Sequence, residues 1–292
     1  MRATTPEQLQ STLQSLFTPE GVAAGLSFQP RPSDIIISPF AKCGTTWIQQ
    51  TVHGLRTRGS MDFGEITEVT PWIEAAADLG WDLDAEQVAD PRAFKSHLSW
   101  DRMPQGGKYI CVFRDPMRAL VSMFKFFEGW VMKPGAISFN RFAYDHFLAR
   151  QAPSSYWHHL VSWLSQRDND RVLLLCYEHL QASFEPAMER IAAFMEIDLD
   201  DELAAIVRRQ SSLAFMQEHG SHFDDHFLRQ QRDPVMGLPP GGSSSKVSSE
   251  DSRAARPQPS QALIADMQLR WDRDVTPATG LENYEQLMSQ MA

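Results

Sequence analysis

The sequence has few of the features that mark secreted, membrane-spanning or nucleic-acid-binding proteins. It has only 3 cysteines, Cys43, Cys111 and Cys176, so we expect buried reduced thiols rather than a disulfide framework. No apolar run approaches the roughly 20 residues that a transmembrane helix requires, and the N-terminus has no signal-peptide core. The net charge of −10 disfavours a general binder of nucleic acid or of anionic membranes. We therefore expect a cytoplasmic protein without stable membrane insertion.

The composition is that of an ordinary globular protein. Of the 292 residues, 42% are hydrophobic and 22% are charged, which suits one domain with a full core. We expect a single domain over residues 1–292. Residues 1–30 form a lead-in, and residues 237–260, which are rich in Pro, Gly and Ser, form a mobile loop or lid.

The most informative stretch begins with a short run of β-branched residues, Asp34 to Ile37. A tight loop with Lys42 and Gly44 follows, and the periodic apolar pattern of a helix starts at Thr45. A helix N-terminus presents unpaired N–H groups and partial positive charge, so this loop predicts a phosphate or sulfate site. The nucleoside-triphosphate loop is absent, because here the lysine precedes the glycine.

Basic and polar residues also follow the other predicted strands, which span residues 92–98, 108–113 and 171–177. In an open parallel sheet, ligands bind beyond the carboxyl ends of the strands. Lys95, His97 and Arg114 should therefore face the same crevice as Lys42. The alternation of strands and helices predicts an α/β fold, a parallel central sheet flanked by helices.

The segment Lys42-Cys-Gly-Thr-Thr-Trp47 resembles the 5′-phosphosulfate loop of the cytosolic-type sulfotransferases. This family uses 3′-phosphoadenosine 5′-phosphosulfate (PAPS) on a fold that is similar to that of P-loop kinases. Lys95-Ser-His97 resembles the family's Lys-Thr-His segment, and Arg114 with Ser122 resembles its 3′-phosphate site. Tyr177, after the fourth strand, corresponds to a tyrosine that contacts the adenine.

The chain departs from the family's pattern at several positions. Ser211 and Leu213 match the segment that flanks the nucleoside, but Leu213 replaces an aromatic residue, and Cys43 replaces a serine. The family's Arg-Lys-Gly lid is missing, which leaves Lys246 as the nearest candidate for closing over the 3′-phosphate. This departure puts lid closure and the family's dimer contact in doubt, so the oligomeric state, monomer or homodimer, stays open.

The resemblance implies in-line transfer of a sulfuryl group from PAPS to a hydroxyl, with release of 3′-phosphoadenosine 5′-phosphate (PAP) and without a metal. His97 is implied as general base, Lys42 as the cation on the leaving phosphate, and Lys95 as a group that steers the sulfuryl. The residues implied to bind the donor are Lys42, Cys43, Gly44, Thr45, Thr46, Trp47, Arg114, Ser122, Tyr177, Ser211, Leu213 and Lys246.

An apolar acceptor pocket is predicted from aromatic residues, although packing explains Trp72 and Trp81 equally well. The segment from Thr70 to Leu79 is expected to be a helix that places these tryptophans near the loop. The candidates for the pocket are Trp72, Trp81, Phe124, Phe127 and Trp130, which favour a small alcohol, phenol or lipid-like acceptor. Residues 219–226 contain histidines and aspartates whose spacing fits no established metal site, so we expect a solvated loop there.

Two other classes of function fit parts of the sequence. A nucleotide or small-molecule kinase needs magnesium ligands and a lysine after the second glycine of its loop, and neither is evident. A catalytically silent PAPS- or PAP-binding protein would keep Arg114 and Ser122 but lack a base, and the presence of His97 with Lys95 argues against it.

Overall fold

The computed structural model describes residues 1–241, 246 and 257–291, so most of the predicted lid lies outside the described residues. Its centre is a parallel 4-stranded sheet in the order β2-β1-β3-β4. The strands are β1 (Ile35–Ile37), β2 (Ala93–Lys95), β3 (Lys108–Phe113) and β4 (Val172–Cys176). The predicted parallel sheet flanked by helices is confirmed, and all 3 cysteines are buried and unpaired.

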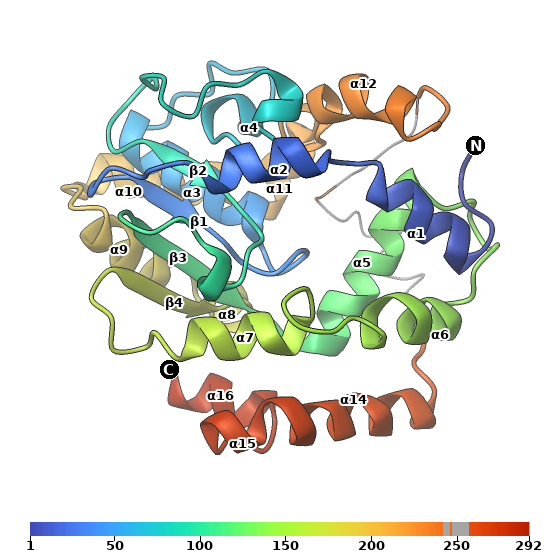
Figure 1. The fold of residues 1–292 in the computed structure, drawn as a ribbon. Coiled ribbons are helices and arrows are strands. Elements are labelled where there is room, and N and C mark those ends of the chain that lie inside the picture. The colour runs from blue at the N-terminus through green and yellow to red at the C-terminus, as the bar shows by residue number, and fades with distance from the viewer. Residues whose placement is uncertain (242–245, 247–256, 292) are drawn as a thin grey trace.

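Helices cover both faces of the sheet, as Figure 1 shows. They are α1 (Pro6–Gln14), α2 (Pro19–Leu26), α3 (Thr45–Thr57), α4 (Ile66–Val69), α5 (Pro116–Trp130), α6 (Phe139–Phe142), the π-helix η3 (Ala143–Leu148), α7 (Tyr156–Leu164), α8 (Tyr177–Ala182), α9 (Phe184–Phe194), α10 (Asp201–Gln210), α11 (Leu213–Glu218), α12 (His226–Val235), α14 (Gln261–Asp274), α15 (Thr276–Thr279) and α16 (Tyr284–Gln290). Short 3₁₀ turns are η1 (Ala77–Leu79), η2 (Trp100–Arg102) and η4 (Gly220–Phe223). None of the helices described is long and apolar enough to cross a membrane.

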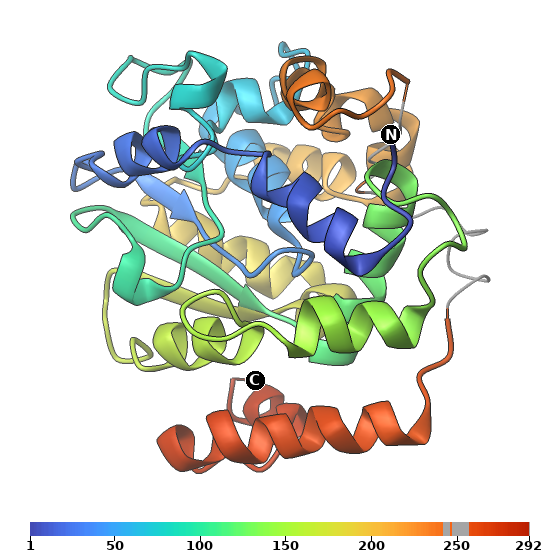
Figure 2. The same ribbon diagram turned by 45° about the vertical axis from the view of Figure 1, so that its right-hand side comes forward.

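The side chains of β1 alternate between two cores because successive residues of a strand point to opposite faces. Ile35 and Ile37 pack with residues of α3, α9 and α10, whereas Ile36 packs with the aromatic core that α5 and α7 contribute. The C-terminal helices α14 to α16 form an outer layer beyond α7 (Figure 2). Both faces of the sheet are therefore covered by apolar packing. A ligand can approach the sheet at the ends of its strands.

The prediction of a helix from Thr70 to Leu79 is wrong, because only its last turn, η1, is helical. Instead, the chain at Trp72 runs parallel to β2. The amide of Ile73 donates to the carbonyl of Lys95 at 2.9 Å, and the amide of Lys95 donates to Pro71 at 2.8 Å. These hydrogen bonds satisfy the exposed edge of β2, a long-range pairing that outweighs the local helical pattern.

A buried ion pair fixes the amino ends of two strands. The guanidinium of Arg92 holds both oxygens of Asp34, with Nη2–Oδ2 at 2.6 Å and Nε–Oδ1 at 2.9 Å, and the residues are 1% and 0% exposed. Asp34 also accepts from the amide of Arg31 at 2.7 Å. Because Asp34 precedes β1 and Arg92 precedes β2, this pair sets the registration of the strands whose other ends carry the site.

We predict that Arg92→Met lowers the free energy of unfolding by about 3–5 kcal/mol, since it leaves the Asp34 carboxylate buried without its partner. Urea denaturation measures the change. The matched control is Arg31→Met, which removes an ion pair to Glu86 whose side chains are 43% and 76% exposed and should cost about 1 kcal/mol or less. Equal effects of the two variants would contradict a structural role for the buried pair.

Candidate active site

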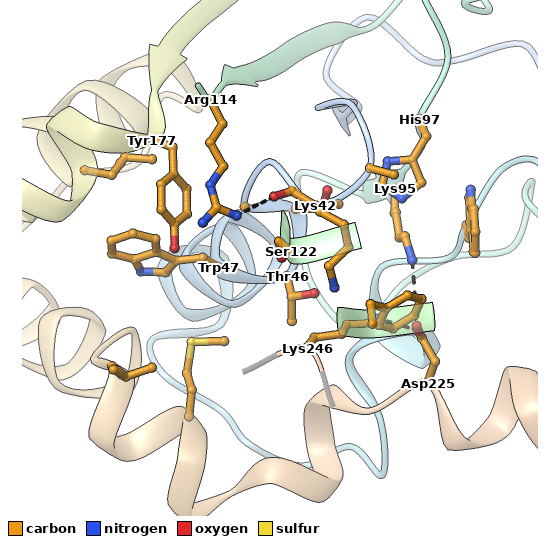
Figure 3. A pocket seen from close by; sticks show the side chains of 18 of the residues that line it. Lys42, Thr46, Trp47, Lys95, His97, Arg114, Ser122, Tyr177, Asp225 and Lys246 are labelled. Atoms are coloured by element: carbon orange, nitrogen blue, oxygen red, sulfur yellow. Dashed lines mark hydrogen bonds and ion pairs between the residues drawn. The ribbon is translucent and has the colours of Figure 1, made fainter. Parts of the chain in front are cut away.

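A cavity of about 730 Å³ opens where the four strands end. Its lining includes at least one residue that follows each strand, namely Lys42 after β1, His97 after β2, Arg114 after β3 and Tyr177, the first residue of α8, after β4. Figure 3 shows these side chains turned toward a common space. The sheet thus collects residues that are far apart in the sequence into a single site.

The loop between β1 and α3 wraps this space with its backbone. Gly44 has φ of +100°, and a Cβ added there would lie 2.9 Å from the ring of Tyr177, so only glycine fits. Arg114 Nη1 donates to the carbonyl of Lys42 at 2.7 Å and ties the loop to the end of β3. Gly44 provides no side-chain cap for α3, and the buried Thr45 hydroxyl has no hydrogen-bond partner among the described residues. These free donors suit a phosphate or sulfate group.

Cations crowd the cavity. Lys42 Nζ lies 4.0 Å from the ring centroid of Phe126, and Lys95 Nζ lies 3.9 Å from that of Trp72. Burial and then the charge of Lys246 lower the pKa of Lys42 to about 7 and that of Lys95 to about 8. These low pKa values show that the ammonium groups are removed from water and repel one another. An anion with several charges would stabilise such a cluster.

A buried carboxylate pairs with these cations, and no motif in the sequence indicated it. Asp225, which is 4% exposed and has φ of +56°, pairs with Lys246 and lies 3.9 Å from Lys95 Nζ (Figure 3). Burial raises the pKa of its carboxyl, but Lys246 and Lys95 outweigh burial and bring the pKa down to about 2. The prediction of a solvated loop over residues 219–226 is therefore wrong at Asp225, whose partners are distant in the sequence.

The ring of His97 is held in one tautomer. Its Nδ1 lies 2.8 Å from the carbonyl of Pro39, which only accepts, so Nδ1 carries the hydrogen and Nε2 keeps its lone pair. Trp72 packs edge-on against the ring, with centroids 5.3 Å apart. Burial and then Lys95 lower the pKa of His97 to about 3. The imidazole is therefore a neutral proton acceptor that lines the cavity.

An aromatic group forms another part of the wall. Trp47 lies edge-on to Tyr177 at 5.7 Å and stacks on Phe184 at 5.5 Å, and the guanidinium of Arg114 lies 4.2 Å from the Tyr177 ring centroid. Flat rings and a guanidinium at this spacing suit a planar heterocycle. Ser122, Ser211 and Leu213 also line the cavity.

Most of the predicted site residues meet in the cavity, but three side chains do not. Cys43 points into the core with its Sγ near the carbonyl of Ala41, so only its backbone belongs to the loop. Phe124 packs against Phe139 and Phe142 in the core. Trp81 packs at the edge of the core and does not line the cavity. These side chains are structural.

Part of the cavity wall comes from residues that the sequence did not indicate. Leu13, Leu16 and Phe17, in α1 and the turn after it, line it together with Trp72, Phe127 and Trp130. Phe17 meets Trp72 edge-on at 4.9 Å. The sequence shows the apolar spacing of α1, but this pattern is the same for a helix face that lines a ligand site and for one that packs in the core. Across the described ranges, no group of His, Cys, Asp and Glu has the arrangement of a metal site.

Comparison with known proteins agrees with this geometry. A family model described as "Sulfotransferase domain" matches residues 32–233. Sulfotransferase 6B1 of Danio rerio is 25% identical over 224 residues, which are 75% of this chain and 75% of that protein. Sulfotransferase 2A1 of Homo sapiens is 28% identical over 204 residues, which are 66% and 69% of the two chains.

Two solved structures share the fold over nearly the whole chain. A retinol dehydratase in complex with retinol and PAP has a TM-score of 0.64 at 16% identity and covers 95% of this chain and 96% of that one. Mouse sulfotransferase SULT7A1 complexed with PAP has a TM-score of 0.62 at 20% identity and covers 95% of each chain.

We predict that PAP binding is coupled to proton uptake. At pH 8 most of the Lys42 side chains are neutral in the free protein, because their pKa is about 7, and a bound phosphate favours the ammonium form. Affinity should therefore fall as the pH rises above about 7. Calorimetry in two buffers of different ionisation enthalpy measures the uptake. Lys42→Arg, which stays charged, should reduce the uptake, and uptake equal to that of the wild type would contradict the assignment.

Proposed function

The chain belongs to the sulfotransferase domain family, as its sequence predicts, and from this premise we propose an in-line transfer of a sulfuryl group from PAPS to a hydroxyl of a small acceptor, with His97 as general base. The prediction of a PAPS-dependent sulfotransferase is confirmed at the level of the family. The observation that carries the proposed mechanism is that Nε2 of His97 keeps its lone pair in the same cavity as the Lys42 loop.

The donor nucleotide would be held at both of its ends. Lys42, the N–H groups at the start of α3 and the Thr45 and Thr46 hydroxyls suit the 5′-phosphosulfate. Arg114 and Ser122 suit the 3′-phosphate, with Lys246 as a further cation of the cavity. Trp47 and Tyr177 would enclose the adenine. The solved structures with the same fold contain PAP, which supports this placement of the nucleotide.

The reaction needs one proton transfer and one displacement. His97 Nε2 accepts the proton of the acceptor hydroxyl as the acceptor oxygen forms a bond to sulfur, and the bond from sulfur to the phosphate oxygen breaks on the opposite side. PAP leaves with an additional negative charge on its 5′-phosphate, and Lys42 and the start of α3 stabilise that charge as it grows. Lys95 neutralises the sulfuryl oxygens, and His97 afterwards releases its proton to solvent.

The acceptor would lie against the apolar wall. This wall is lined by Leu13, Phe17, Trp72, Phe127 and Trp130, which provide little hydrogen bonding for a polar sugar, and it reaches His97 through the contact of Trp72 with the imidazole. An apolar alcohol, a phenol or a lipid-like molecule fits such a lining better than a polysaccharide does. A hydroxyl of this molecule must reach His97, since that is where the proton is taken.

We predict that His97→Ala lowers kcat by about 10²–10⁴-fold, because general-base catalysis contributes about that much, and that PAP still stabilises the variant. PAP formation from PAPS with 1-naphthol measures turnover, and the thermal shift with PAP measures binding. The control is His158→Ala, which removes a partly exposed imidazole that pairs with Asp101 away from the cavity. Loss of PAP binding in His97→Ala would show that His97 is structural.

We predict that Arg114→Ala weakens PAP binding by roughly 10- to 100-fold, the worth of charge-assisted hydrogen bonds to one phosphate. The binding of 5′-AMP, which lacks the 3′-phosphate, should weaken less. Arg114→Lys is the matched variant, because it keeps the charge but lacks the planar fork that donates to the carbonyl of Lys42 and can still hold a phosphate with two aligned hydrogen bonds. Calorimetric titration with both nucleotides gives the ratio, and an equal loss for the two would place Arg114 elsewhere than at the 3′-phosphate.

A further inference from the structure

A cation that the proposed reaction does not use also lines the cavity. Arg150 follows the π-helix η3 and is half-buried. No residue motif pointed to it, and the roles given to Lys42, Lys95, Arg114 and Lys246 leave it without a function. A guanidinium in the wall of a reaction cavity requires an explanation, because removing a charge from water is costly unless a partner compensates it.

No described residue compensates this charge. The one polar partner of the side chain is His146, whose Nε2 lies 2.6 Å from Arg150 Nη2, and no Asp or Glu of the described residues forms an ion pair with Arg150. A guanidinium only donates, so His146 accepts and is neutral. Burial and then Arg150 lower the pKa of His146 to about 3. Burial lowers the pKa of Arg150 to about 10, so it remains charged at neutral pH.

The backbone that carries Arg150 is held by the C-terminal layer. Arg270 of α14 donates through Nη1 to the carbonyl of Leu148 at 2.5 Å and through Nη2 to the carbonyl of Arg150 at 2.8 Å. Arg270 is itself buried, pairs with Asp274 at 2.5 Å and lies over the ring of Trp157. These hydrogen bonds fix the backbone at Arg150, and the contact with His146 then holds the guanidinium beside the cavity.

Arg150 belongs to the wall proposed for the acceptor. Helix α1, whose end and following turn supply Leu13, Leu16 and Phe17, packs against η3. Phe127 lies 5.4 Å from the ring of His146, the partner of Arg150. The nucleotide end of the cavity is built instead from Arg114, Tyr177 and the Lys42 loop, after β3, β4 and β1.

We propose that the acceptor is an amphipathic hydroxy acid, whose apolar body packs on the α1 wall and whose anionic group, such as a carboxylate, pairs with Arg150. The proposal rests on the proposed function and narrows its acceptor class. A planar guanidinium gives a carboxylate two aligned, charge-assisted hydrogen bonds. The hydroxyl to be sulfated then lies at His97, so the enzyme selects molecules with an acid at a set distance from an alcohol or phenol.

The test compares each acid with its neutral methyl ester as acceptor. The probes are 12-hydroxydodecanoate and 3-(4-hydroxyphenyl)propanoate with their esters, and PAP formation from PAPS gives kcat/KM. We expect the wild type to prefer the acids by roughly 10- to 100-fold, as for charged hydrogen bonds. Arg150→Gln should bring the ratio of acid to ester near one, mainly through KM for the acid, and Arg150→Lys should keep part of it.

Two controls separate the possible failures. Arg141→Gln removes an arginine of α6 whose side chain is 59% exposed and lies outside the cavity. This variant should keep the wild-type ratio of acid to ester. The thermal shift with PAP is measured for every variant. A protein that does not bind PAP overturns the proposed function itself. A protein that binds PAP but does not prefer the acids, or whose preference survives in Arg150→Gln, overturns only the role of Arg150. A loss of PAP affinity in Arg150→Gln as large as that in Arg114→Ala would assign Arg150 to the nucleotide and also overturn it.

Discussion

Mutual repulsion among the buried cations is the constraint on which the rest of the site depends. Lys42 and Lys95 share the cavity with Arg114 and Lys246, and Asp225 is the carboxylate that touches two of them among the described residues. Burial and repulsion together lower the pKa of both Lys42 and Lys95. Such a cluster favours a ligand with several negative charges, and it weakens the basicity of any histidine nearby. In the proposed reaction the negative charges of the bound donor offset the cluster, and this offset raises the pKa of His97 back toward the range of an effective general base.

The fold holds these charges in place through contacts that lie away from the ligand. The pair of Asp34 and Arg92 fixes the beginnings of β1 and β2, and the hydrogen bond from Arg114 to the Lys42 carbonyl fixes the loop that follows β1. The carbonyl of Pro39 sets the tautomer of His97. Each of these is a short hydrogen bond between segments far apart in the sequence, so the geometry of the site depends on the parallel sheet as a whole.

Much of the fold and of the nucleotide side of the cavity could be predicted, because the signals there are local. The residues from Asp34 to Thr45 predict a strand, a loop and the start of a helix. Lys95, His97 and Arg114 lie at or just after the carboxyl ends of strands, and these ends lie side by side in a parallel sheet. The acceptor side could be predicted only in part, because Trp72, Phe127 and Trp130 line the cavity as expected but their neighbours there were not foreseen. Asp225 meets Lys95 only through tertiary packing. In the same way, only tertiary packing brings the end of α1 to the cavity. Trp72 pairs with the edge of β2 instead of lying in a helix. Nor does the sequence show that α14 clamps the backbone at Arg150.

The central claim is that the cavity binds a nucleotide with a 3′-phosphate and no metal, and a thermal shift of the purified protein tests it most directly. A ligand that binds only the folded state must raise the unfolding temperature. We expect PAP to stabilise the protein without magnesium, and we expect no stabilisation by ATP with magnesium. Stabilisation by ATP with magnesium alone would contradict it and would identify the site as that of a kinase.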